Sequence, residues 1–185
     1  MSLMLTTLNL GNMMSKQTVV DLLEASGYSP EAIAGILGNL AVETGGTFDP
    51  KTKQIGGSAV GAFQFDYMKP HYKAWLKENK KKDSLENQVL FFDDTIFGDS
   101  QDIIGAGNAA KLQEVIKGGK PEDVATALTT LWFRPGKPHL ERRVGEARNI
   151  YGELIGGKEE DINKNSLFEG DFFTSLKSSL NNLFK

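Results

Sequence analysis

The sequence predicts a mainly α-helical (α+β) fold that contains one small β-hairpin or structured loop. Apolar residues recur at helical spacing along most of the chain, and many of these segments begin with a capping residue and end at glycine. Residues 51–67 differ, because glycines cluster there and helical periodicity is lost. With 185 residues and 39% hydrophobic residues, the chain can bury the core of one domain without disulfide bonds.

Two helices are predicted before the glycine-rich segment. The first covers about residues 16–25 and is closed by Gly27. The second begins at Ser29, a good capping residue, with Pro30 in its first turn. The two glycines at 45–46 can supply its left-handed end. The apolar residues that follow helical spacing in this second helix are Ile33, Ile36, Leu37 and Leu40.

Residues 51–67 are predicted to form the irregular β-hairpin or structured loop, in which Val60, Phe63 and Phe65 favour short extended segments. Five further helices are predicted after this segment, each from a start signal or from apolar spacing. They begin near Pro70, after the capping-box-like residues 83–86, near residue 109, at Pro121 and at Pro138.

Three parts of the chain are predicted. Residues 1–14 form an N-terminal tail, of natural or vector origin, and residues 15–157 form the main domain. Residues 158–185 comprise a polar linker and an amphipathic C-terminal helix. This last helix can dock on its own domain or bind a partner, and disorder is the third alternative.

Composition excludes several classes of function. A net charge of −3 and a pI near 5.5 argue against a broadly cationic nucleic-acid-binding protein. No apolar run approaches the roughly 18 residues of a membrane span, and the amphipathic C-terminal segment carries only two lysines, so membrane contact is not expected. The N-terminus lacks a basic region and a small-residue cleavage site, so no signal peptide is predicted.

The residue types present also argue against metal and thiol chemistry. The chain has no cysteine, which removes disulfides, zinc–thiolate sites and cysteine nucleophiles. Its two histidines, His71 and His139, are too few and too far apart for a histidine metal site. We therefore expect no metal and no cofactor.

Glu43 is the most informative single residue. It falls in the last turn of the second predicted helix, within about 20° of Ile36 and about 60° of Leu40 around the axis. Partial burial and the negative end of the helix dipole would both favour its protonated form. A general acid needs this form. The alternative is a glutamate that frays at the helix end and reaches solvent.

Three blocks around Glu43 resemble those of a known family. The sequence contains "IAGILGNLAVETGGTFDP", then "GAFQF", then "LWFRPGKPHLERRVGEARNIY", in that order. The first two resemble the active-site signature of the lysozyme-like superfamily. All three together resemble the phage tail lysozymes, the domains of virion-associated proteins that degrade peptidoglycan, over about residues 15–155. The resemblance implies a lysozyme-like helical domain.

The resemblance also implies roles for individual residues. Glu43 would be the general acid that protonates the glycosidic oxygen between N-acetylmuramic acid and N-acetylglucosamine. Gln64 would hydrogen-bond the substrate or position the attacking group. Thr44 replaces the usual serine and keeps the hydroxyl, and Phe65 replaces the usual tryptophan on a sugar-facing surface.

The second carboxylate is left open. Many glycosidases use two carboxylates, and Asp49 and Asp66 are the local candidates, although Asp49 precedes a proline and can equally be a turn former. If neither acts, Glu43 works alone. Lytic transglycosylases of the same superfamily use this mechanism, in which the muramoyl 6-hydroxyl attacks and an anhydro sugar forms.

The third block supplies candidate contacts to the peptides of the cell-wall polymer. Arg134 and His139 are predicted to bind substrate, whereas Arg142 and Arg143 are interpreted as ordinary surface or ion-paired residues near a helix start. Trp132 and Phe133 are interpreted as core or as cleft wall.

The predicted function is therefore cleavage of peptidoglycan glycan strands by a phage muramidase, with lytic transglycosylation as the alternative. The partners expected are bacterial peptidoglycan and, through the C-terminal helix, other virion proteins. The expected location is the virion, or the host cytoplasm before action on the cell wall. A rival from another class is a non-catalytic virion or wall-binding protein on the same fold. An amidase or endopeptidase lacks a suitable metal or nucleophile set.

Overall fold

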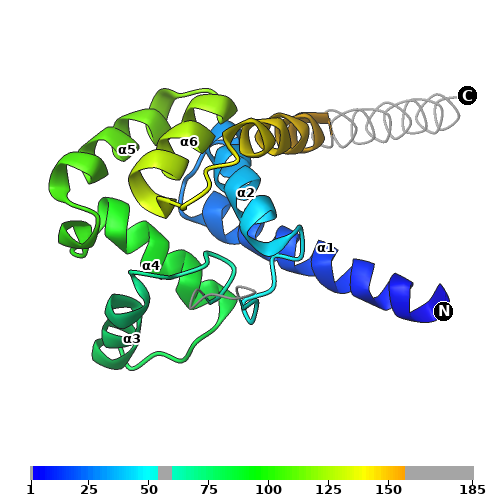
Figure 1. Cartoon of the computed structure of the whole chain (residues 1–185), viewed down its shortest axis with the longest axis horizontal. Coiled ribbons are helices and arrows are strands. Elements are labelled where there is room, and N and C mark those ends of the chain that lie inside the picture. The colour runs from blue at the N-terminus through cyan, green and yellow to red at the C-terminus, as the bar shows by residue number, and fades with distance from the viewer. Residues whose placement is uncertain (1, 54–59, 157–185) are drawn as a thin grey trace, which may run out of the picture. The chain divides into compact units, whose positions relative to one another are not determined.

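The computed structural model describes residues 2–53 and 60–156, and helices dominate this part of the chain, as predicted (Figure 1). The labelled α-helices are α1 (Ser2–Ala25), α2 (Pro30–Thr44), α3 (Lys69–Glu78), α4 (Leu85–Phe97), α5 (Ala106–Gly118) and α6 (Pro121–Leu128). A short 3₁₀ turn, η1 (Gln101–Ile103), precedes α5, and a π-helical turn, η2 (Thr129–Phe133), follows α6. A last helix covers residues 140–156.

The chain divides into two compact units, Met1–Tyr151 and Gly152–Lys185, and the candidate site lies within the first. The predicted linker and C-terminal helix of residues 158–185 lie outside the described residues. At the other end, α1 reaches back to Ser2, whereas the sequence predicted a helix only from residue 16. No proline interrupts residues 2–15, so the predicted tail can continue the helix.

The ends of α2 are those that the sequence predicts. The Ser29 hydroxyl accepts a hydrogen bond from the Ala32 amide at 3.2 Å, which caps the first turn. Gly45 ends the helix in the left-handed region, with φ of 61°. Local signals therefore determine that Glu43 lies in the last turn of this helix.

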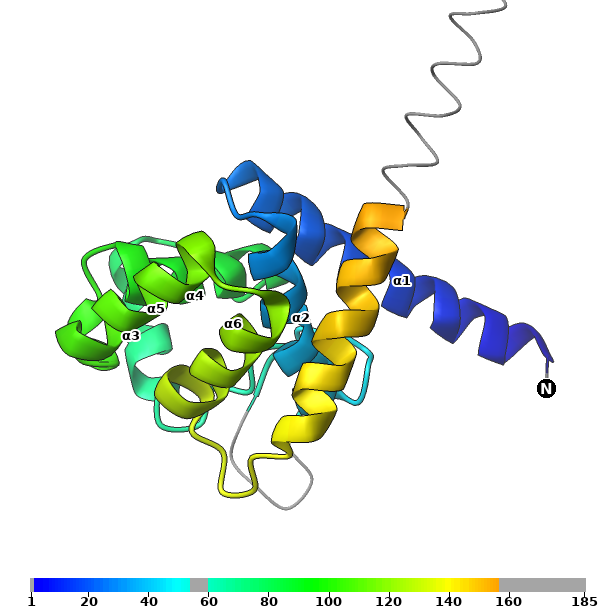
Figure 2. The same cartoon turned by 90° about the horizontal axis from the view of Figure 1, so that it is seen from above.

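α2 is the central helix of the first unit. Every residue from 32 to 40 is buried, so the helix is enclosed on all sides and not on one stripe as expected. It packs most extensively against α6, and residues 140–151 lie along it as well (Figure 2). A Cβ atom on Gly35 would lie 2.5 Å from the Val124 Cβ, so glycine is needed where α6 approaches.

The segment after α2 is irregular. Within the described residues 51–53 and 60–67 there is no strand, and the predicted β-hairpin is not seen there. Val60 makes isolated antiparallel bridges to Lys53 and Phe65. Residues 54–59, the rest of the predicted hairpin, lie outside the described part of the chain.

An aromatic cluster anchors the far end of this segment in the core. Phe63 and Phe65 are fully buried, and the Phe63 ring centroid lies 5.0 Å from that of Phe92. The other rings of the cluster are Tyr72, Phe91 and Trp132. Contacts with α3, α4 and η2 therefore hold residues 60–68 in one place, and this segment forms one wall of the cleft described next.

Candidate active site

Glu43 opens onto a cleft. The cleft has a volume of about 600 Å³, and the Glu43 side chain is 17% exposed. Its walls come from the end of α2, from residues 64–67, from the loop after η2 and from the start of the last helix. The described residues that line it are Val42, Glu43, Gln64, Asp66, Tyr67, Phe133, Arg134, Pro135, Gly136, Lys137, His139 and Arg143.

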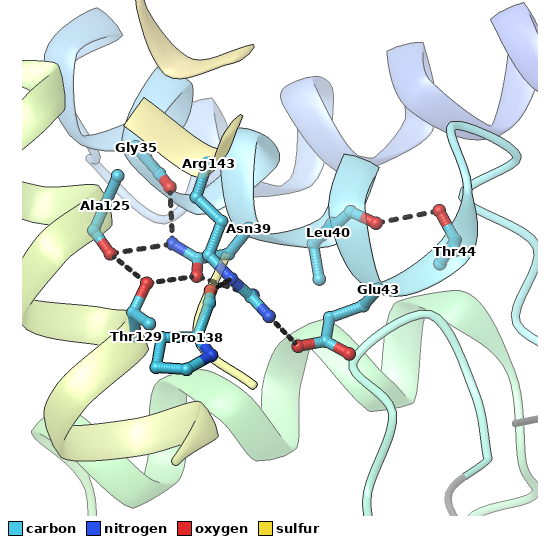
Figure 3. A network of polar contacts seen from close by, with 9 residues as sticks. All are labelled: Gly35, Asn39, Leu40, Glu43, Thr44, Ala125, Thr129, Pro138 and Arg143. Carbon is cyan, nitrogen blue, oxygen red and sulfur yellow. Dashed lines mark hydrogen bonds and ion pairs between the residues drawn. The ribbon is translucent and has the colours of Figure 1, made fainter. Parts of the chain in front are cut away.

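Arg143 forms a buried ion pair with Glu43. Its Nη2 donates a hydrogen bond to Glu43 Oε1 at 2.7 Å, and the arginine side chain is only 2% exposed (Figure 3). The sequence left Arg143 as either a surface residue or an ion-paired one. The structure shows that it is ion-paired and buried. Sequence reasoning considered burial and the helix dipole at Glu43, but not the opposite charge of Arg143 in direct contact with its carboxylate.

The Arg143 guanidinium is held by two further acceptors. Its Nε donates to the Pro138 carbonyl oxygen at 2.7 Å, and its Nη1 donates to Asn39 Oδ1 at 2.9 Å. Asn39 is fully buried in α2, and its amide nitrogen donates to the carbonyl oxygens of Gly35 and Ala125. Figure 3 shows this network, which connects α2, α6 and the last helix and fixes the cation beside Glu43.

Gln64 and Asp66 share the cleft with Glu43. Gln64 has a φ of 48°, which is uncommon for a residue other than glycine, and its amide nitrogen donates to the Gly61 carbonyl oxygen at 2.7 Å. Asp66 is exposed to solvent in the cleft. The segment after α2 thus brings one amide and one carboxylate to the same cleft as Glu43.

Two other predicted site residues do not line the cleft. Asp49 is exposed, and its carboxylate accepts the Lys51 amide at 2.8 Å, the pattern of an aspartate turn. Thr44 is buried. Its hydroxyl donates to the Leu40 carbonyl oxygen at 2.8 Å and accepts the Phe48 amide at 3.0 Å, so it closes the end of α2.

Phe65 does not form the sugar-facing surface that the resemblance implied. Its side chain is 1% exposed, and its ring lies 4.6 Å from the Tyr72 ring, centroid to centroid. The described aromatic side chains that line the cleft are instead Tyr67 and Phe133. Phe65 therefore supports the wall of the cleft from within the core.

A cationic loop forms another part of the cleft wall. Arg134 and His139 line the cleft, as does Lys137 between them, and both Arg134 and His139 have a φ of 46°. Such left-handed backbone in residues other than glycine is often found at functional sites. The Arg134 Nη2 donates to the Ile104 carbonyl oxygen at 2.8 Å, and its guanidinium lies 5.4 Å from the Tyr67 ring centroid.

Sequence reasoning missed the roles of Tyr67 and Arg143. The Tyr67 hydroxyl donates to the Trp132 carbonyl oxygen at 3.0 Å, and burial raises the pKa of this hydroxyl while the charge of Arg134 partly opposes the shift. For Arg143 a signal was present. It precedes Ala147 by four residues and Ile150 by seven, so it lies on the helix face that these buried residues define.

Within residues 2–53 and 60–156, no three carboxylate or imidazole side chains cluster in a way that could hold a metal ion. In the same part of the chain, no helix is long and apolar enough to cross a membrane.

Comparison with protein families identifies one match. The family model described as phage tail lysozyme matches residues 15–154, about three quarters of the chain, and this range contains all of the cleft residues. Among curated proteins, none matches the chain.

Proposed function

The chain belongs to the phage tail lysozyme family, and on this premise we propose that it hydrolyses the glycan strands of bacterial peptidoglycan between N-acetylmuramic acid and N-acetylglucosamine. Glu43 is the general acid of this reaction. The observation that carries the proposal is the position of Glu43. A carboxylate at the end of a buried helix opens onto a cleft that also contains Gln64 and Asp66.

In the proposed reaction, Glu43 gives its proton to the glycosidic oxygen as the bond from this oxygen to C1 of the muramoyl sugar breaks. Water adds at C1 and passes a proton to the carboxylate of Asp66 or of Glu43, which leaves a new reducing end. Asp66 is the second carboxylate and acts on the water or on the positive charge at C1. Gln64 hydrogen-bonds the substrate or positions the water. Asp49, whose carboxylate binds a turn amide, takes no part.

The cationic loop is proposed to bind the peptides attached to the glycan. Arg134 and His139 are the candidates, since both line the cleft and the carboxylates of stem peptides are anions. Tyr67 and Phe133 offer aromatic faces to the sugar rings. Thr44 and Phe65 support the cleft without contacting the substrate. Thr44 closes the end of α2, and Phe65 packs in the core.

A lytic transglycosylase is the second candidate. Of the two carboxylates proposed to assist Glu43, only Asp66 lines the cleft. If Asp66 is dispensable, Glu43 acts alone. The muramoyl 6-hydroxyl then attacks C1 in place of water and forms a 1,6-anhydro sugar.

We propose that the enzyme acts from the virion. Residues 15–157 form the catalytic domain, and the helix expected in residues 158–185 attaches it to other virion proteins. With a net charge of −3, the protein gains little from adsorption to an anionic cell envelope. Tethering to a particle would instead supply the local concentration.

The test is solubilisation of purified peptidoglycan by the wild type and by Glu43→Gln, followed by mass spectrometry of the products. We expect the wild type to release fragments with reducing ends and the variant to release none. Anhydro ends would identify the transglycosylase. Equal release by both proteins would refute the role of Glu43, and no release by a folded wild type would favour a structural or wall-binding protein.

A further inference from the structure

A group of exposed lysines lies outside the cleft, on α3 and on the turn that follows it. α3 packs against α4 at the margin of the first unit (Figure 1). The members of this lysine patch are Lys73, Lys77, Lys80, Lys81 and Lys82. All five are exposed, and among the described residues none of their side chains forms an ion pair or a hydrogen bond. Their positive charges therefore face solvent without a partner in this part of the chain.

The stretch that contains the lysine patch is basic in a chain that is acidic overall. Residues 69–83 contain six lysines and two acidic residues, whereas the rest of the chain has 15 basic and 22 acidic residues. At physiological salt, exposed charges more than about 8–10 Å apart are largely screened from one another. A polymer close to α3 therefore meets the local positive charge and not the net charge of −3.

The backbone at the end of α3 gathers the lysines. Lys73 and Lys77 are four residues apart and share one face of the helix. The Lys80 amide donates to the Lys77 carbonyl oxygen at 3.2 Å, and the Lys81 amide donates to the Leu76 carbonyl oxygen at 2.8 Å. These bonds hold the next turn against the helix end. The helix dipole acts only within the last turn, so it accounts for Lys77 but not for the lysines beyond the helix.

The lysine patch is firmly connected to the wall of the cleft. Asp66 and Tyr67 line the cleft, and α3 begins at Lys69, two residues after Tyr67. Tyr72 of α3 is buried, and its ring centroid lies 4.6 Å from that of Phe65 in the aromatic core. The ten residues of α3 span about 15 Å. The helix thus holds the lysines at a fixed position, within about one helix length of the cleft wall.

We propose that the lysine patch binds a phosphodiester polymer attached to the peptidoglycan and so orients the enzyme on the cell wall. The inference rests on the proposed function, because it takes peptidoglycan to be the substrate. Such a polymer carries a negative charge in every repeating unit, which complements several cations spaced along a helix and its following turn. A net charge of −3 gives no long-range attraction, so the patch acts once the virion has brought the enzyme to the wall.

The composition of the lysine patch favours a flexible polyanion over a membrane or a nucleic acid. Its cations are all lysines, which are point charges without the fixed bidentate geometry of arginine. None of the exposed large hydrophobic side chains in the described part of the chain lies within residues 69–83. The indole of Trp75 is half-buried, and its Nε1 donates to Asp94 at 3.0 Å. The stretch therefore lacks an exposed ring on which a base could stack and an apolar anchor for a lipid surface.

The experiment measures cosedimentation of the protein with Gram-positive cell walls in the cold, before and after hydrofluoric acid removes their phosphodiester polymers. A patch variant replaces three lysines by glutamine, and a control variant makes the same change at three exposed lysines of α5 and the turn after it. Both variants lose the same net charge. They are Lys80→Gln/Lys81→Gln/Lys82→Gln and Lys111→Gln/Lys117→Gln/Lys120→Gln.

We expect the wild type and the control variant to bind untreated walls at least about tenfold more tightly than the patch variant at low salt. Added salt should remove this difference, and all three proteins should bind acid-treated walls equally. Equal binding of the two variants to untreated walls would overturn the inference. Tighter binding of the wild type to anionic vesicles or to DNA than to untreated walls would also overturn it, in favour of that partner.

A second patch variant covers the case in which the first does not fold, which circular dichroism would reveal. Lys73→Gln/Lys77→Gln removes two charges from the same surface, on the helix itself. We expect it to bind untreated walls about threefold or more less tightly than the wild type. Binding as tight as that of the wild type would overturn the inference.

The two proposals fail in different ways, because the binding assay does not depend on catalysis. If Glu43→Gln solubilises peptidoglycan as well as the wild type, the proposed function is refuted. If Glu43→Gln is inactive and the patch and control variants bind untreated walls equally, only the inference about the lysine patch is refuted.

Discussion

Gly38 lies directly against the backbone of Arg143. A Cβ atom on Gly38 would be 2.7 Å from the Arg143 carbonyl oxygen and 2.8 Å from the Ala147 amide nitrogen. No side chain can therefore stand between α2 and the last helix at this point. This close approach of the two helices lets the Arg143 guanidinium reach Glu43, five residues further along α2.

Gly38→Ala should destabilise the protein and reduce its activity. The added methyl group meets backbone atoms, so the helices must separate, which we expect to cost about 1–3 kcal/mol in the free energy of unfolding. Gly145→Ala is the matched control on the last helix, because its Cβ would meet nothing within 4 Å. Loss of a helical glycine there should raise stability by about 0.5–1 kcal/mol. Urea unfolding measures the free energy of unfolding of both variants. Equal effects of the two substitutions would contradict the close approach of the helices at Gly38.

Asn39→Ala should be strongly destabilising. The Asn39 Oδ1 accepts hydrogen bonds from Thr129 and Arg143, both at 2.9 Å, and the truncation leaves these buried donors without that acceptor. We expect a loss of at least about 2 kcal/mol in urea unfolding. Asn149→Ala, at an exposed asparagine of the last helix, should change stability by less than about 0.5 kcal/mol. A similar small effect at both positions would show that the buried network contributes little.

Asp66→Asn and Asp49→Asn should separate the two candidate carboxylates. Asp66 lines the cleft, so its loss should reduce the rate of peptidoglycan hydrolysis by about 10²-fold or more if it is the second catalytic carboxylate. Asp49 accepts a turn amide, and Asp49→Asn should leave the rate near that of the wild type. Turbidity assays of cell walls measure the rates of both variants. A larger loss of rate in Asp49→Asn than in Asp66→Asn would make Asp49 the second carboxylate.

The four tyrosines should make the protein sensitive to alkali. Burial raises the pKa of the Tyr28 and Tyr72 hydroxyls, as do their hydrogen bonds to Asp93 and Asp83. Burial also raises the pKa of Tyr67, and the hydrogen bond to Glu31 raises that of Tyr151.

These pKa values are higher in the folded than in the unfolded protein, so they favour folding at pH values below the ordinary tyrosine pKa of 10.0. The stabilisation falls as the pH rises above this value. Ultraviolet titration should therefore show that Tyr28 and Tyr72 form little tyrosinate until the protein unfolds, as followed by circular dichroism. Ionisation of all four tyrosines near pH 10 in the folded protein would contradict the raised pKa values of their hydroxyls.

Some features of the site could be predicted because their causes lie within a few residues. The serine cap, the proline and the left-handed glycine define α2, and they place Glu43 in its last turn. The order of the three motif blocks indicated the family, which the match over residues 15–154 confirms. Gln64 and Asp66 lie one residue on either side of Phe65, which is anchored in the aromatic core, and both line the cleft.

Other features required the tertiary structure. The period of an irregular loop does not define an inner and an outer face, so Phe65 could not be assigned to the core before the chain was folded. For Asp49, the proline that follows it did offer the turn that the structure shows. The charge beside Glu43 depends on a residue 100 positions away. Local sequence thus determined the helix that carries Glu43. Packing over Gly38 decided that a buried arginine lies against it, because only long-range contacts bring the two helices together.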